Sequence, residues 1–159
     1  MNVLHAPIGR RLLLFVAVVS SLTAAGCSRK LDKWERQRPN TYKVRGQVLW
    51  DGKPEAEVFV TFESRSHNLT AVGITDASGR FALKTFNEGD GAVAGDHAVR
   101  LEKTVMVRPP NASPETPSSQ VSVSPKKYAN TATSGLTATV VEKGPNEVMI
   151  EITGPRADP

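Results

Sequence analysis

From residue 42 to residue 153, apolar and polar side chains alternate along the chain with a period of two. In the first such stretch Val44 and Val48 alternate with Arg45 and Gln47. This alternation is typical of half-buried β-strands, and no part of the region keeps the longer period of a helix. We therefore predict an all-β domain with seven strands, around residues 44–50, 58–62, 72–74, 81–83, 99–101, 136–140 and 148–152.

The connections between these strands carry turn-forming residues. Asp51-Gly52 lies between the first two strands, where glycine can supply the positive φ of a tight hairpin. Asp76 and Gly79 lie between the third and fourth strands, where the aspartate can accept backbone hydrogen bonds. Short strands joined by turns at this spacing predict a β-sandwich of the immunoglobulin-like or transthyretin-like kind over residues 42–153.

One connection has a different composition. Residues 109–125 hold five prolines and six serines or threonines among 17 residues, with Glu115 the only charge. Such a segment cannot build a core of its own, so we predict a mobile loop. We expect Tyr128 to fix the loop to the sandwich, and we take Lys126, Lys127 and Tyr128 as a candidate interaction loop.

The first 26 residues follow another pattern. Arg10 and Arg11 precede a continuous apolar run over residues 12–19, and small residues lead up to Cys27. This order is typical of a secretory signal peptide, and the apolar run is too short for a comfortable transmembrane helix. We therefore predict a signal peptide over residues 1–26.

Cys27 is the only cysteine, so it cannot form a disulfide within the chain. The run LTAAGC that it ends resembles the lipobox of bacterial lipoproteins, although Ala24 stands where leucine is usual. The resemblance implies that Cys27 is acylated and becomes the new amino end. The alternative is an ordinary signal peptide cleaved near Ala25, which would leave Cys27 free.

Two or three acyl chains would anchor the exported chain to a bacterial membrane. Ser28 follows the cysteine, and the lipoprotein resemblance then favours the outer membrane over the inner one, facing the periplasm or the cell surface. Residues 27–41 are expected to form a polar tether and residues 154–159 a tail. The basic residues of the tether would lie over anionic head groups or simply be solvated.

Charge and composition narrow the range of functions. Loss of residues 1–26 removes Arg10 and Arg11, so the net charge falls from +4 to 4 − 2 = +2, and we expect no nucleic-acid partner. The remaining histidines, His67 and His97, are too few for a typical zinc site, and no G-x-S-x-G motif is present. We therefore predict no catalysis, no metal and no cofactor.

Three segments carry a further resemblance. VLWDGKP at residues 48–54, TDASGRF at 75–81 and DGAVAGDH at 90–97 resemble the carboxypeptidase regulatory-like domains, which have a transthyretin-like sandwich. The segments at 125–128 and 134–137 resemble the late part of small bacterial lipoproteins of this type. The resemblance implies a companion or surface module without catalysis.

The expected function is therefore that of a lipid-anchored envelope protein that binds a protein or glycan through loops or a sheet edge. The alternative is a periplasmic metal or small-ligand binder that uses Asp51, Asp76, His67 and His97. A hydrolase is a distant third.

Overall fold

The computed structural model describes residues 32–113 and 115–157, which are divided into two compact units, the first ending at Arg38 and the second beginning at Pro39. The first contains a short 3-10 helix, η1 (Glu35–Gln37), in which Asp32 Oδ1 accepts from the Glu35 amide at 2.6 Å. The predicted signal peptide and the acylation of Cys27 lie outside the described residues. Within the described residues, no helix is long and apolar enough to cross a membrane.

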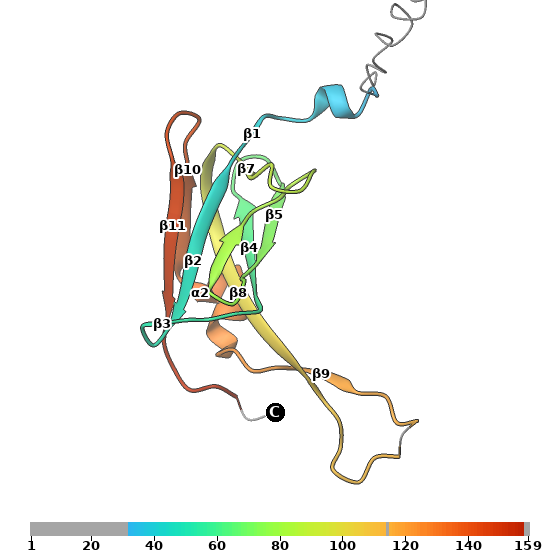
Figure 1. Ribbon diagram of the computed structural model, residues 1–159. Helices are drawn as coiled ribbons and strands as arrows, with labels where there is room; N and C mark the ends of the chain where they lie inside the picture. Colours follow the sequence, from blue (N-terminus) through green and yellow to red (C-terminus); the bar gives the residue numbers. More distant parts are fainter. Residues whose placement is uncertain (1–31, 114, 158–159) are drawn as a thin grey trace, which may run out of the picture. The chain divides into compact units, whose positions relative to one another are not determined.

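The second unit is mostly β-structure, as the alternating pattern predicts, and each of the seven predicted segments overlaps a strand (Figure 1). Four further strands are short. The strands are β1 (Thr41–Tyr42), β2 (Val44–Trp50), β3 (Lys53–Pro54), β4 (Val58–Ser64), β5 (Thr70–Ile74), β6 (Arg80–Ala82), β7 (Ala92–Val93), β8 (Gly95–Val107), β9 (Ser119–Ser122), β10 (Leu136–Val140) and β11 (Asn146–Ile152).

Two main sheets make up a sandwich-like domain. One is antiparallel, with the order β10-β8-β4-β5, and β9 pairs with the far end of β8. The other has β2 at its centre, with β11 on one side and β3 and β6 on the other. β11 runs parallel to β2 over its whole length, while the other pairs in this sheet are antiparallel.

The core lies between these sheets. Val44, Val48 and Trp50 of β2 join Val60 and Phe62 of β4 in one buried cluster. Because strand side chains alternate between faces, those at the odd-numbered positions of β2 point outward, which is the arrangement that the period of two predicts. Burial of these side chains is the main favourable contribution to folding.

The prediction of a loop over residues 109–125 was wrong for the second half of that segment. Residues Ser119–Ser122 form β9, which pairs with the last four residues of β8, and Val123 N donates to Lys103 O at 2.8 Å. The low apolar content of this segment hid the strand, because backbone pairing to an already formed neighbour needs little apolar side-chain pattern. Mobility of the remaining loop stays a prediction.

Two short helices follow β9. They are η2 (Lys126–Ala129) and α2 (Thr131–Ser134). Asn130 caps α2 by accepting from the Ala132 amide at 2.8 Å, and Gly135 ends it with φ 68°. Four residues are too few to show helical periodicity, so the sequence pattern missed both.

Candidate functional site

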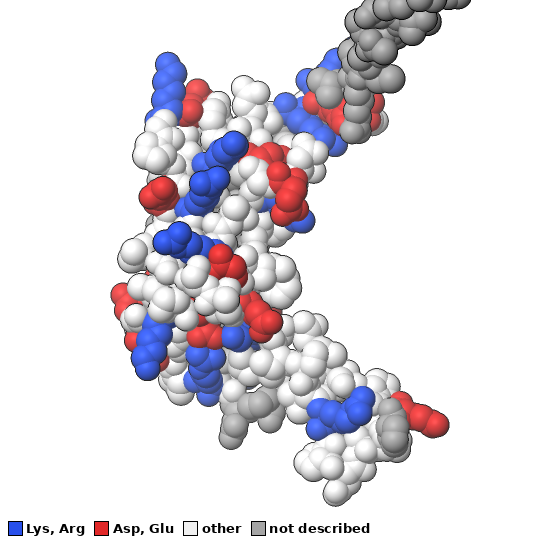
Figure 2. Space-filling view, in the orientation of Figure 1, with Lys and Arg blue, Asp and Glu red and all other residues white. Residues whose placement is uncertain are grey.

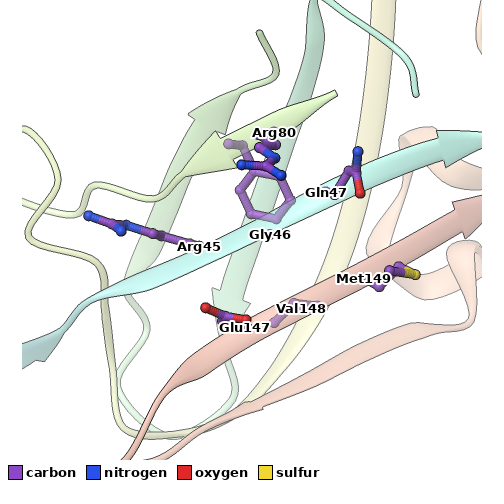
Figure 3. A pocket seen from close by; sticks show the side chains of 8 residues that line it. Arg45, Gly46, Gln47, Arg80, Glu147, Val148 and Met149 are labelled. Atoms are coloured by element: carbon purple, nitrogen blue, oxygen red, sulfur yellow. The ribbon is translucent and has the colours of Figure 1, made fainter. Parts of the chain in front are cut away.

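A shallow depression of about 530 Å³ lies on the outer face of the sheet that contains β2. Figure 3 shows side chains from β2, β6 and β11 gathered around it. Its lining consists of Arg45, Gly46, Gln47, Arg80, Phe81, Glu147, Val148 and Met149.

Strand register decides which of these side chains face outward. Gln47 lies opposite Arg80 on β6 and Met149 on β11, and Arg45 lies opposite Glu147. Neighbours at paired positions share a face, so these five side chains form the outer surface of the depression. Met149 adds a thioether that is 71% exposed.

Local hydrogen bonds hold two parts of this surface. Gln47 Nε2 donates to Ser78 O at 2.9 Å, which ties the β2 side chain to the turn that precedes β6. In that turn Asp76 Oδ1 accepts from Ser78 N at 2.8 Å, from Ser78 Oγ at 2.7 Å and from Arg80 N at 3.0 Å. These bonds, that of the Ser78 hydroxyl first, lower the pKa of Asp76. The turn therefore positions Arg80 at the depression.

The depression carries the guanidinium groups of Arg45 and Arg80 and the carboxylate of Glu147. Guanidinium groups bind carboxylate, phosphate and sulfate oxygens through paired hydrogen bonds, and an exposed methionine suits an apolar contact beside them. This arrangement fits a ligand with an anionic group next to an apolar one. The sequence pattern placed Arg45 and Gln47 on one face of β2. It could not show that Arg80 and Met149 lie on the same face, because that depends on how β6 and β11 pair with β2.

The three residues of the predicted interaction loop differ in exposure. Tyr128 lies in η2 with only 5% of its surface exposed, and its hydroxyl accepts from Thr153 N at 3.1 Å. Lys126 and Lys127 are exposed, with Lys127 Nζ 4.4 Å from the centre of the Tyr128 ring. Tyr128 thus packs in the core and joins the segment after β9 to the end of β11, while an interaction role of the two lysines stays a prediction.

The residues of the alternative metal site are held by other contacts. His97 is 1% exposed, 5.9 Å from the Phe62 ring centre, and burial lowers its pKa. His67 is exposed, and its Nδ1 lies 2.8 Å from Ser66 Oγ. Asp51 and Asp76 occupy turns, Asp51 with φ 49°. Among the described residues no group of three or more acidic, histidine or cysteine side chains is placed to hold a metal ion.

A buried ion-pair cluster escaped the sequence pattern. Glu55, with a side chain 9% exposed, accepts from Arg156 Nη1 at 3.0 Å and Nη2 at 2.6 Å and pairs with Lys103 Nζ. The hydrogen bond from Arg156 is the largest influence on the Glu55 carboxyl and, with Lys103, holds its pKa below the usual value despite burial. Lys103 is 48 positions and Arg156 is 101 positions from Glu55 in the chain, so no local sequence motif indicates the cluster.

Arg156 also covers the core tryptophan. Its guanidinium carbon lies 4.4 Å from the centre of a Trp50 ring, and Trp50 Nε1 donates to Gly154 O at 2.9 Å. Ala157 N donates to Val123 O at 3.0 Å. The segment predicted as a tail is therefore fastened to the sandwich through residue 157.

The described residues define a β-rich, sandwich-like domain. No family model and no curated protein matches the sequence. Among solved structures, the chain is similar to a 9R-lipoxygenase from Cyanothece, with 15% sequence identity and a TM-score of 0.39. The similarity covers 95% of this chain and 21% of the lipoxygenase chain, so this chain spans about a fifth of that protein's length.

Proposed function

We propose that this protein is a non-catalytic, lipid-anchored envelope protein whose β-sandwich binds a protein or glycan. The observation that carries the proposal is the depression on the outer face of β2, β6 and β11, which Arg45, Arg80 and Met149 line together. Arginine and methionine are enriched at protein interfaces, and arginine is often a binding hot spot. The ligand therefore presents an anionic group.

The finer fold belongs to the same proposal. The seven segments with period-two alternation, the two packed sheets and the Asp51-Gly52 hairpin support an immunoglobulin-like or transthyretin-like sandwich of the carboxypeptidase regulatory-like kind. Domains of this kind bind through surfaces rather than through an enclosed active site, which agrees with a shallow depression.

The binding proposal is tested with a photoreactive residue in place of Met149 in the full-length protein in intact cells. We expect cross-linking to an envelope protein or glycan, and at least a tenfold loss of cross-linked product in the double variant Arg45→Gln/Arg80→Gln, about 1.4 kcal/mol of binding free energy. Lys53→Gln is the control, because it removes an exposed positive charge from the same sheet outside the depression.

Equal loss in the control and the double variant would overturn the proposed site. Mass spectrometry of the purified protein gives the second readout. A retained metal ion or small molecule would contradict the proposal in favour of a periplasmic metal or small-ligand binder.

The anchor is proposed on the lipobox resemblance that ends at Cys27 and on the tether that follows it. Metabolic labelling with a palmitate analogue should label the protein and place it in the membrane fraction, outer membrane rather than inner. The variant Cys27→Ser should lose the label and the membrane association. An unlabelled, processed original protein in the soluble fraction would contradict the anchor.

A further inference from the structure

The far end of β8 and β9 form a two-stranded arm, residues 103–122, that reaches beyond the sandwich (Figure 1). β8 pairs with β10 from Gly95 to Val99 and with β4 from His97 to Lys103. Among the described strands, only β9 pairs with residues 104–107. Two-stranded hairpins are marginally stable in water, so an arm of this kind gains from a further strand.

Backbone direction shows which side of the arm is open. Lys103 O accepts from Val123 N at 2.8 Å and Val99 O accepts from Ser134 Oγ at 2.5 Å, so odd-numbered residues of β8 turn their backbone groups toward β9 and α2. Strand alternation then turns the N–H and C=O of Thr104 and Met106 to the opposite side, the side of β4. β4 begins at Val58, opposite Lys103, and leaves that side of Thr104 and Met106 without a described strand.

The side chains of the arm are apolar and weakly charged. Val105 and Val107 continue the core-facing side of β8, and Val121 of β9 lies opposite Val105. All three are half-buried, while Met106 on the other face is 68% exposed. Arg108 and Glu115 are the only charges from residue 104 to residue 124. Figure 2 shows the visible face of the arm mostly white.

Natural sheet edges are usually protected by charges, prolines or bulges. Residues 104–107, Thr-Val-Met-Val, contain neither charge nor proline. An edge of this composition with free backbone groups is suited to strand addition, in which an extended peptide supplies the missing hydrogen bonds.

We propose that the edge Thr104–Val107 binds an extended segment of another protein, which joins the sheet as an added strand in line with β4. The segment spans at least four residues with no charge at its centre. Its backbone forms hydrogen bonds with that of Thr104 and Met106, and its alternate apolar side chains pack against Val105 and Val107. A carboxylate at its outer end would meet Arg108.

A second copy of this chain is a poorer occupant. Because Val58 of β4 lies beside Lys103, two identical antiparallel edges overlap most when Met106 lies opposite Met106 and Thr104 lies opposite Arg108. Such a contact joins about five residues of each copy, and burial per copy falls well below the roughly 800 Å² of a standard interface. A longer partner strand with its own surface can also cover Met106 and β9.

The test uses the full-length protein in intact cells, with a photoreactive residue in place of Met106. We expect one captured protein, distinct from the chain itself, and at least a tenfold loss of capture in Thr104→Pro, because proline removes the N–H that faces the open edge. Gln120→Pro is the matched control. Both variants lose the bond from Gln120 Nε2 to Thr104 Oγ1, but Gln120, paired across from Met106, turns its N–H toward the outer side of β9.

Equal capture in Thr104→Pro and the original, or equal loss in both proline variants, overturns strand addition. Capture of a second copy replaces the partner with a homodimer and also overturns the proposal. Hydrogen exchange on the purified protein needs no partner: the Met106 amide should exchange at least tenfold faster than that of Val105. Comparable protection would show that the edge is already closed. Since Met149 reports on the depression and Met106 on the arm, the two proposals fail separately.

Discussion

At the scale of single residues, Gly46 shows how closely β2 packs against β6 and β11. It lies on the core-facing side of β2, opposite Phe81 on β6 and Val148 on β11. A Cβ at Gly46 would collide with the Phe81 ring and with the Val148 carbonyl oxygen. Glycine is therefore required here by space, whereas the glycines of the turns are required by positive φ.

Gly46→Ala should lower the free energy of unfolding by about 1–3 kcal/mol, because the ring and the neighbouring backbone must shift to admit the methyl group. Chemical denaturation followed by circular dichroism measures the change. Gly89→Ala serves as the comparison, since Gly89 has φ 68° and nothing within 4 Å, and should cost only about 1 kcal/mol. A Gly46→Ala protein as stable as the original would contradict the close packing.

At the scale of elements, the period-two alternation predicted all seven main strands, because each has one face in the core. It missed β9, η2 and α2, whose stability comes from pairing and capping rather than from an apolar face. The candidate site was also beyond the sequence. Arg45 and Arg80 are 35 positions apart in the chain and come together through the pairing of β2 with β6. Tyr128 was expected to fix the loop to the sandwich, and its hydroxyl joins η2 to Thr153, just after β11.

The Glu55 cluster joins the end of the chain to the sandwich and gives stability a pH dependence. The folded-state pKa of Glu55 is below its ordinary value of 4.5, so its contribution is complete above about pH 4.5 and is lost as pH falls through the folded pKa. Arg156→Ala should cost about 1–2 kcal/mol at pH 7, a figure discounted because Arg156 is half exposed. The difference from the original protein should shrink as the solution is acidified below pH 4.5.

Unfolding measured from pH 7 to pH 3 tests this prediction. Arg65→Ala is the matched control, since it removes an exposed arginine elsewhere on the domain and should change stability by less than about 0.5 kcal/mol. If Arg65→Ala and Arg156→Ala gave the same values at every pH, the ion pair would contribute nothing measurable.

At the scale of the whole molecule, the described domain has two surfaces that we propose for binding, and they differ in what they present. The depression on β2, β6 and β11 presents arginine side chains, and the arm presents backbone groups. They belong to different sheets, because the depression lies on the sheet that contains β2 and the arm extends the sheet that contains β8. A partner recognised through side-chain charge and a partner recognised through its extended backbone would therefore leave each other's binding surface free.

The parallel pairing of β2 with β11 has a consequence for the order of folding. On one side, the first long strand of the domain, β2, pairs with residues 146–152, about a hundred positions later. A nascent polypeptide that has not yet reached β11 lacks one side of its central strand, and contacts between such distant positions form slowly. The sheet around β2 is therefore completed only after β11, the last strand of the domain, has been synthesised.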